Sequence, residues 1–593
     1  MNLYKDIEIL FSKKEKKKIL LLFFGIIIMG LIEVAGVASI APFMAVVSNP
    51  DIIQENEYLS ILYSYFNFDS SNSFLLSLGI LVLSLLVISN AYTAFITWQI
   101  TYFVKMQNHH LSMKLLKSYL MQPYLFFLNR NTADLGKNIL VEVGRSIEGV
   151  ILPIMLTLSK CIVTICILIF LIFVDPALAL AILLVLGGAY LVIFKLVKNR
   201  LANIGKRTVA MILARFKIAN EAMSGIKDLK LSNNESEFIR RFEEPSENLA
   251  QFSAQSSLIS TLPRYALEAI AFGGIVSIVI YLILIGKQGS EVVPIISLYA
   301  LAGYRLMPAL QQIYAGITGA KYNYPALKTL VEDLRSLSTS EEIDNDNTVE
   351  INLIEKIEVK SLSFSYPKGD NILKDFNLKI DANTTVGFVG STGSGKTTLV
   401  DLLLGLLMSN NGSITVDNKN ITSSNLRSWQ KNLGYIPQII YLSDDTLTNN
   451  IAFGVPLHEM DFEKIKQAAK WAQLDNFITS LPEGYDTVVG ERGVRLSGGQ
   501  RQRIGIARAL YHDPQVLIMD EATSALDRIT ENVIIETIKN FSHKKTIIMV
   551  AHRLATIKEC DIIHIIDKGN IVDSGSYDSL IEGNLVFREL AET

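Results

Sequence analysis

Long runs of apolar residues dominate the first half of the chain. A helix rises 1.5 Å per residue, so about 20 apolar residues cross a hydrocarbon core of roughly 30 Å. The run ILLLFFGIIIMGLIEVAGVASIAPFM has one charge in 26 residues, which predicts a membrane span rather than a helix buried in a soluble protein. Six spans are expected, at about 19–46, 73–104, 147–174, 176–197, 257–286 and 292–318.

The distribution of basic residues predicts the orientation of these spans. KKEKKK at 13–18 precedes the first span, and no Lys or Arg occurs between Ile19 and Val104, whereas 105–146 and 195–241 are rich in both. Because basic loops stay in the cytoplasm, we expect a cytoplasmic N-terminus and an external loop at 49–72. The chain is expected to be a multi-pass protein of the cytoplasmic membrane.

The second half has the pattern of a soluble α/β domain. Acidic and small polar residues cluster in SLSTSEEIDNDNTVEINL, as in a linker between domains. Beyond it, strand-like runs such as TTVGFVG and QVLIMD alternate with helical patterns. The expected domains are a transmembrane domain at 1–335, a linker at 336–355 and a soluble domain at 356–593.

Composition adds little to this picture. Half of the 593 residues are hydrophobic and the formal net charge is −3. We expect no nucleic-acid partner. Cys161 and Cys166 lie within a predicted span and Cys560 in the soluble half, so neither a disulfide framework nor a cysteine metal site is expected.

The segment GSTGSGKT matches the phosphate-binding motif G-x-x-x-x-G-K-[ST] and lies between a strand pattern and a helix pattern. Its glycines let backbone N–H groups curl around phosphates at the start of a helix. Lys396 is predicted to reach the β- and γ-phosphates of ATP, and the Thr397 hydroxyl to bind Mg²⁺. The predicted ATP-binding residues here are Gly390, Ser391, Thr392, Gly393, Ser394, Gly395, Lys396, Thr397 and Thr398.

A second stretch, VLIMDE, is an apolar strand that ends in two carboxylates. Asp520 is predicted to help hold Mg²⁺ and Glu521 to polarise the attacking water. A strand that ends in Asp-Glu is more often an ordinary solvated terminus when it stands alone. Its pairing with the phosphate-binding motif favours nucleotide hydrolysis.

Between these two motifs lies LSGGQRQR, followed by a helical pattern. With this segment the second half resembles the nucleotide-binding domain of ABC transporters, whose signature is LSGGQ. The order of phosphate-binding loop, signature and acidic strand is also the order of that family. The resemblance implies that ATP is also bound by Ser497, Gly498, Gly499 and Gln500.

The remaining family elements match single positions. The resemblance implies that Tyr366 in FSYPKG stacks on adenine and that Gln438 in GYIPQ contacts Mg²⁺ and the membrane domain. Asp527 in SALD matches a loop at the dimer interface. His552 in VAHRL matches the catalytic switch histidine that contacts the γ-phosphate. VVGERG, AMSGIKDLK and QPYLFFLN fall where the family places segments that couple the two domains.

In the family, two nucleotide-binding domains enclose two ATP molecules, each between the phosphate-binding loop of one and the signature of the other. The resemblance therefore implies a dimer. Six spans followed by one nucleotide-binding domain resemble a half-exporter with the type I exporter fold. A homodimer is the simpler expectation, and a paralogous half-transporter is the alternative.

Ionisable residues within the predicted spans are candidates for substrate binding, because a charge in hydrocarbon costs several kcal/mol. Arg264 and Glu268 are four residues apart, so an ion pair within one helix is the alternative to a substrate site. Arg305 has no acidic residue nearby in sequence. It is expected to face a water-filled cavity and to receive an anionic headgroup.

Short stretches of the membrane half, LIEVAGVASIAPFMAVVSNP, LPRYALEAIAFG and GYRLMPALQQI, resemble ABC flippases that move lipid-linked oligosaccharides across bacterial membranes. The external segment ENEYLSILYSYFNF has the period of a short amphipathic helix at the membrane interface. The resembling flippases have an external helix there that is proposed to contact the polyprenyl tail. The side chains expected to contact lipid are Tyr58, Leu62, Tyr65 and Phe66; a packed loop that caps the helices is the alternative.

These patterns predict an ATP-driven flippase for a lipid-linked oligosaccharide or a similar amphipathic lipid. A multidrug or peptide exporter would have the same ATPase and a different cavity. An ATP-gated channel or regulatory membrane ATPase belongs to another class. The acidic pair at the end of VLIMDE argues for repeated turnover, and so against a purely gating role.

Overall fold

The computed structural model describes residues 3–588. The exceptions within this range are 175, 177–179, 181–182, 285–288, 338–349, 368, 491–492, 521–534, 537, 552–553 and 586. The chain divides into two compact units. The first comprises Met1–Gln122 and Asn129–Ser340, and the second comprises Pro123–Leu128 and Glu341–Thr593.

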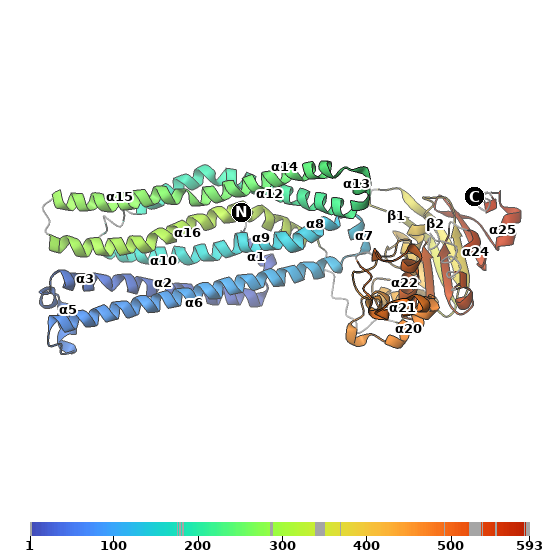
Figure 1. Ribbon diagram of the computed structural model, residues 1–593, viewed down its shortest axis with the longest axis horizontal. Coiled ribbons are helices and arrows are strands. Elements are labelled where there is room, and N and C mark those ends of the chain that lie inside the picture. The colour runs from blue at the N-terminus through green and yellow to red at the C-terminus, as the bar shows by residue number, and fades with distance from the viewer. Residues whose placement is uncertain are drawn as a thin grey trace. The chain divides into compact units, whose positions relative to one another are not determined.

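Long helices that run side by side build the first unit (Figure 1). The helix α6 has 50 residues, a length of about 75 Å at 1.5 Å per residue. That is more than twice the roughly 30 Å of a hydrocarbon core, so α6 extends well beyond a membrane. The long helices are α2 (Lys13–Ala38), α6 (Ser71–Leu120), α10 (Leu152–Val174), α12 (Gly188–Ser224), α14 (Glu235–Thr261), α15 (Pro263–Leu284) and α16 (Gly289–Ser336).

Three stretches of the described chain are long and apolar enough to cross a membrane. They contain the first two predicted spans and all but the last residue of the third. The other three predicted spans fall on α12, α15, α16 and the residues before them, where part of the chain lies outside the described residues, so the count of six stays a prediction. The three stretches are Lys13–Ser48, Ser71–Leu120 and Thr132–Phe173.

Local sequence explains where the first span begins and bends. Ser12 caps α2, accepting a hydrogen bond from the Glu15 N–H, while the Glu15 carboxylate accepts one from the Ser12 N–H. This reciprocal pair satisfies two N–H groups that a helix start leaves free. The helix breaks at Ser39, and the span continues as α3. After α3 (Ile40–Ser48), the expected external loop forms two short helices, α4 (Ile52–Glu55) and α5 (Glu57–Tyr65).

Two short helices lie in the segments expected to couple the domains. The helix α7 (Tyr124–Leu128) belongs to the second compact unit, where Leu125 packs against the hydrophobic core. The helix α13 (Ile226–Ser232) belongs to the first unit. Its side chains Ile226 and Leu231 are exposed.

The second unit contains two sheets. A six-stranded sheet has the order β10-β9-β3-β8-β7-β6, with β10 antiparallel to β9 and the other neighbours parallel. A four-stranded antiparallel sheet has the order β2-β1-β4-β5. The strands are β1 (Lys356–Ser365), β2 (Asn371–Asp381), β3 (Thr385–Val389), β4 (Asn411–Val416), β5 (Lys419–Asn420), β6 (Leu433–Ile436), β7 (Val516–Asp520), β8 (Thr546–Val550), β9 (Ile562–Asp567) and β10 (Asn570–Gly575).

The centre of the six-stranded sheet explains the apolar runs in the sequence. Every residue of β3, β7 and β8 is buried, as expected for parallel strands covered on both faces. Because parallel strands end at the same edge of a sheet, the loop after β3 and the last residue of β7 lie at one edge. The polar residues of this loop and of the end of β7 therefore lie at the edge where open α/β sheets bind ligands.

Candidate functional site

The phosphate-binding loop connects β3 to the helix α17 (Lys396–Leu403). Gly395, just before the helix, has φ = +104°, a conformation that residues with a Cβ rarely adopt. Gly390, at the start of the loop, is restricted by space: a Cβ there would lie 2.0 Å from the backbone oxygen of Ile566. Both glycines are therefore required by the backbone path around the loop.

Lys396 points back into this loop. Its side chain is buried, and its Nζ donates hydrogen bonds to the carbonyl oxygens of Gly390 at 2.8 Å and Ser391 at 2.9 Å. The Ser394 hydroxyl lies 3.5 Å from the same nitrogen. The ammonium is thus held at the mouth of the loop, beside the N-terminus of α17, where N–H groups and the helix dipole attract phosphate.

A cavity of about 530 Å³ opens over the loop and the start of α17. Five of its lining residues were not predicted, and two of these five are cationic: Lys374 of β2, and Lys568 in the turn between β9 and β10. Both add positive charge beside the loop. The lining residues are Asp370, Asn371, Ile372, Lys374, Thr392, Gly393, Gly395, Lys396, Thr397, Thr398 and Lys568.

Asp520, the last residue of β7, is buried. Burial and the charge of Asp520 together raise the pKa of Asp401, on α17, to about 6. The carboxylate of Asp520, the hydroxyl of Thr397 and the amide oxygen of Gln438 are hard oxygen donors, the ligand type that Mg²⁺ takes together with substrate phosphates. The described residues contain no cluster of His, Cys, Asp and Glu able to hold a metal by protein ligands alone.

The signature residues form the start of another helix, α22 (Gly498–Leu510). Ser497 caps it by accepting a hydrogen bond from the Gln500 N–H at 3.2 Å, and the Gln500 side chain accepts one from the Ser497 N–H at 2.8 Å. Ser497 and Gly498 are exposed, and nothing lies within 4 Å of a Cβ built on Gly498. None of the four signature residues lines the cavity over the phosphate-binding loop.

The other predicted residues of the ATP site either do not line that cavity or lie outside the described residues. Tyr366 is partly buried, with its ring edge-on to Phe364 at 5.1 Å between centroids. Gln438, shortly after β6, is exposed. Neither lines the cavity. Three predicted residues lie outside the described residues: Glu521, Asp527 and His552.

The two arginines of the membrane half differ in their contacts. On α15, the Nε of Arg264 donates a hydrogen bond to the Glu268 carboxylate at 2.5 Å, so the ion pair within one helix is formed. Arg305, on α16, is partly buried, and across the described chain it forms no ion pair. Of the two arginines, Arg305 is therefore the candidate for binding an anionic ligand.

The external segment contains the helix α5, which two side chains attach to the rest of the unit. Leu59 is buried in a cluster with Val46, Ile53 and Phe74, and the ring of Tyr63 lies 5.4 Å from that of Phe74. The neighbouring apolar side chains point away from this cluster and are exposed by 43 to 78%. The exposed set is Tyr58, Ile61, Leu62, Tyr65 and Phe66.

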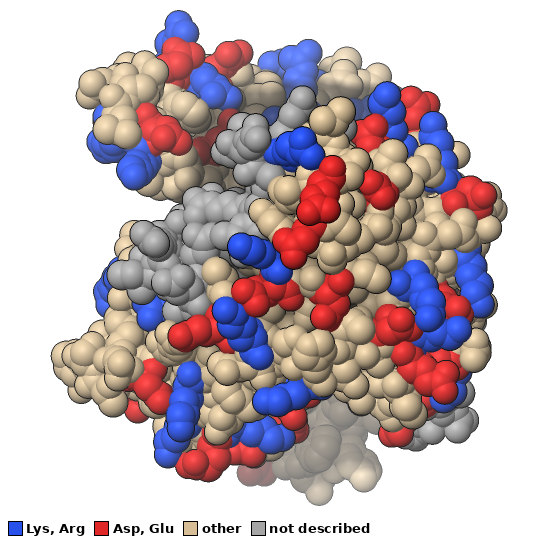
Figure 2. Space-filling view, turned by 90° about the vertical axis from the view of Figure 1, so that its right-hand side faces the viewer, with Lys and Arg blue, Asp and Glu red and all other residues tan. Residues whose placement is uncertain are grey.

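The charged side chains of the second unit are mixed in sign. Figure 2 shows Lys and Arg interspersed with Asp and Glu over the face it presents. A surface of this kind is typical of a soluble domain.

Comparison with known proteins identifies both halves. Residues 373–524 match the ABC transporter family, and residues 19–308 match the ABC transporter transmembrane region. An ATP-dependent lipid A-core flippase of Syntrophus aciditrophicus is 34% identical over 472 residues, which are 78% of this chain and 76% of that protein. A flippase of the same name from Legionella pneumophila is 35% identical over 374 residues, 62% of this chain and 61% of that protein.

The fold has a counterpart among solved structures. A bacterial Atm1-family ABC exporter with ATP bound superposes with a TM-score of 0.78 over 96% of this chain and 97% of that chain, at 22% identity. The architecture is thus the type I ABC exporter fold. The chain belongs to the ABC transporter family: it is a half-exporter whose transmembrane region is fused to an ATP-binding domain, a membrane ATPase coupled to transport.

Proposed function

We propose that the chain works as a homodimer that uses ATP to flip a lipid-linked oligosaccharide, or a similar amphipathic lipid, across the cytoplasmic membrane. Its N-terminus and nucleotide-binding domain lie in the cytoplasm. The observation that supports the proposed class of substrate is the exposed aromatic face of α5. The orientation rests on the basic residues that flank the predicted spans.

The dimer follows from the position of the signature. Ser497 and Gly498 form an exposed helix start, apart from the phosphate-binding cavity of their own chain. A helix N-terminus attracts phosphate. A second copy can place its signature over this chain's cavity, so that each ATP contacts both chains.

Within each site, Lys396 holds the β- and γ-phosphates. Thr397, Asp520 and Gln438 would hold Mg²⁺, which would neutralise negative charge on the phosphates. Glu521 orients and polarises the attacking water, and His552 contacts the γ-phosphate. The cationic Lys374 and Lys568 raise the affinity of the cavity for the phosphate chain.

The exposed face of α5 fits a lipid tail. Five neighbouring apolar side chains turn away from the protein while Leu59 and Tyr63 hold the helix in place. Tyr suits the depth of the membrane interface, where a ring is half in lipid and its hydroxyl in water. A helix at this level contacts acyl or polyprenyl chains that stay in the bilayer while the headgroup crosses.

The headgroup requires a different partner. Arg305 forms no ion pair within the described chain, and a guanidinium binds phosphate oxygens with two parallel hydrogen bonds. We assign it to a pyrophosphate or phosphate group of the substrate. The two relatives are named for flipping lipid A-core, which is consistent with an amphipathic lipid as cargo.

The test is depletion of the protein in its native cell, followed by mass spectrometry of membrane lipids. Polyprenyl-linked glycans are expected to accumulate, and re-expression of the wild-type chain is expected to clear them. A variant with Tyr58, Tyr65 and Phe66 changed to Ala should fail to clear them while keeping basal ATPase activity. The control is Tyr102→Ala, which removes an exposed aromatic side chain from a different helix, α6.

Absence of accumulation would contradict the flippase assignment and favour the multidrug or peptide exporter. Clearance by the triple variant would contradict the role of α5 alone. Equal failure of Tyr102→Ala would show that any lost aromatic disturbs the protein.

A further inference from the structure

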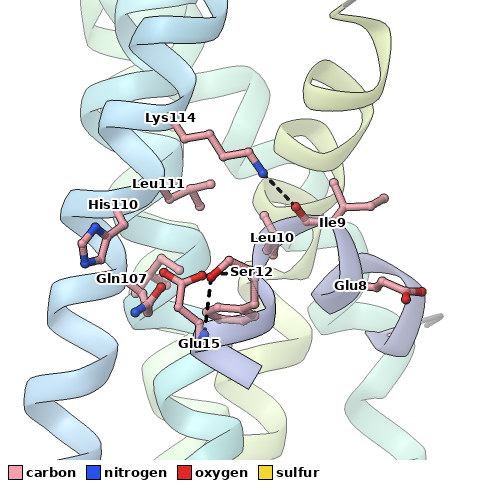
Figure 3. Close-up of a pocket in the computed structure, with 11 residues that line it drawn as sticks. Glu8, Ile9, Leu10, Ser12, Glu15, Gln107, His110, Leu111 and Lys114 are labelled. Atoms are coloured by element: carbon pink, nitrogen blue, oxygen red, sulfur yellow. Dashed lines mark hydrogen bonds between the residues drawn. The ribbon is translucent and has the colours of Figure 1, made fainter. Parts of the chain in front are cut away.

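Acidic and lysine side chains line a cavity of about 420 Å³ in the first unit, where the helix α1 (Leu3–Leu10) and the start of α2 approach α6 (Figure 3). Each of these side chains has a contact within the chain. Lys114 donates a hydrogen bond to the backbone oxygen of Ile9 at 3.0 Å, drawn as a dashed line in Figure 3. Glu15 accepts a hydrogen bond in the cap of α2, and Glu8 lies 3.8 Å from an ammonium at the start of that helix. These contacts account for the charges of this cavity without a ligand.

The cavity over the phosphate-binding loop contains a carboxylate that is not accounted for in this way. Its charged lining consists of three lysines and Asp370. Asp370 is exposed, and among the described residues it has no hydrogen-bond or ion-pair partner. A carboxylate repels the phosphates that the lysines attract. Its place in the cavity therefore fits a part of the ligand that donates hydrogen bonds, and not the phosphate chain.

Asp370 lies opposite Tyr366 at the mouth of the hairpin between β1 and β2. The last residue of β1, Ser365, pairs with the first residue of β2, Asn371. Tyr366 directly follows Ser365 and Asp370 directly precedes Asn371, so these two residues flank the last pair of the ladder. The Gly369 N–H donates a hydrogen bond to the Tyr366 carbonyl oxygen at 2.9 Å, which closes the turn. The hairpin thus holds Asp370 beside Tyr366.

This position lies on the path between the two ends of a bound ATP. The phosphates are expected at Lys396, and the resemblance to the family implies that adenine stacks on Tyr366. The ribose joins the base to the phosphates, so it must lie between them. Asp370 stands beside Tyr366 and lines the same cavity as Lys396. The ribose hydroxyls are hydrogen-bond donors, and an ionised carboxylate only accepts.

We propose that the Asp370 carboxylate accepts hydrogen bonds from the 2′- and 3′-hydroxyls of the ribose and makes the site selective for ribonucleotides. A hydrogen bond to an ionised acceptor is stronger than one between neutral groups. A dideoxynucleotide offers no donor, and the carboxylate then only repels its phosphates. The proposal rests on the expected stacking of adenine on Tyr366, and it does not depend on which lipid is carried.

The test compares ATP with 2′,3′-dideoxy-ATP as substrates of the purified full-length protein. In the wild type, kcat/KM for ATP should exceed that for the dideoxy analogue by about tenfold, the loss expected for a hydrogen bond to a charged group. Asp370→Ala should abolish this preference. Its kcat/KM should fall for ATP and should not fall for the analogue, because the analogue loses only a repulsion. Asp370→Asn keeps an uncharged acceptor and should show an intermediate preference.

Asp381→Ala removes an exposed carboxylate from the other end of β2 and is the matched control, which should keep the wild-type preference. Equal kcat/KM for the two nucleotides in the wild type would overturn the proposal. So would an equal change for both nucleotides in Asp370→Ala, since structural damage or plain repulsion would produce it.

The placement of the base is tested separately. Tyr366→Ala should lower kcat/KM for ATP and for the dideoxy analogue by the same factor, because both carry adenine. Wild-type values for Tyr366→Ala would overturn the placement of adenine on which the proposal rests.

Discussion

The Tyr119 phenol, at the end of α6, donates a hydrogen bond to the buried carboxylate of Asp333, near the end of α16. The two residues are 214 positions apart, and Arg130 forms an ion pair with the same carboxylate. This contact joins two long helices of the transmembrane unit beyond the membrane. A buried carboxylate that loses a hydrogen-bond donor still carries the free-energy cost of its desolvation.

Tyr119→Phe removes only the donor and should lower the stability of the transmembrane unit by about 1–3 kcal/mol. The measurement is the melting temperature of the purified protein in detergent. Tyr102→Phe, which removes an exposed hydroxyl from the same helix, should leave the melting temperature unchanged. Equal melting temperatures for Tyr119→Phe and the wild type would show that the hydrogen bond does not stabilise the protein.

Lys396→Ala should reduce ATP hydrolysis by at least about 100-fold, since it removes the cation that meets the phosphates. Binding of a fluorescent ATP analogue and phosphate release would be measured in parallel. Lys379→Ala removes an exposed lysine from β2 and serves as the control. Hydrolysis at the wild-type rate in Lys396→Ala would place the ATP site elsewhere.

Mixed dimers test whether each ATP contacts both chains. A Lys396→Ala chain paired with a Ser497→Arg chain retains one intact site, made of the loop of one and the signature of the other. A chain carrying both substitutions, paired with wild type, retains none. Tandem-tag purification should give roughly half the wild-type ATPase activity for the first pairing and almost none for the second. Equal activity of the two pairings would contradict the shared site.

The pH dependence of stability should reflect His564, on β9. Its Nδ1 lies 2.7 Å from the Ser574 hydroxyl, its Nε2 is buried with no hydrogen-bond partner among the described residues, and burial lowers its pKa. As the pH falls, His564 takes up a proton in the unfolded chain at a higher pH than in the folded chain. The folded state is therefore destabilised relative to the unfolded state below about pH 6.5.

His564→Gln keeps a polar side chain beside Ser574 and cannot take up this proton. Its melting temperature should fall less between pH 7.5 and 5.5 than that of the wild type, measured without nucleotide. His458→Gln, at an exposed position, should behave as wild type. Parallel curves for His564→Gln and wild type would rule out this histidine as the source.

The parts of the site that were predictable from sequence are continuous motifs. Lys396 and the signature were predicted because a glycine loop and LSGGQ are short patterns with fixed spacing, and the structure folds them into a loop and a capped helix start. Lys374 and Lys568 were missed because they reach the same cavity from β2 and from the turn after β9, with no local pattern to link them. Only the sheet topology brings these segments together.

The membrane half shows the same limit. Apolar runs predicted where helices occur, and the four-residue spacing of Arg264 and Glu268 offered an ion pair as the alternative to a substrate site, which is the arrangement that the structure forms. The break at Ser39 was not predicted, although Pro42, three residues later, has no N–H with which to continue the hydrogen bonds of α2. Nor was the buried contact of Tyr119 with Asp333, since it depends on how distant helices pack.

The most direct measurement follows a polyprenyl-pyrophosphate-linked oligosaccharide in proteoliposomes that contain the purified protein. With ATP and Mg²⁺ on the side of the nucleotide-binding domains, the glycan should move to the opposite leaflet, where an added glycosidase cleaves it. Glu521→Gln should stop this movement, and Arg305→Ala should stop it while basal ATPase activity remains. If the glycolipid stays in place while the same vesicles move a drug or peptide in an ATP-dependent way, the flippase assignment is wrong.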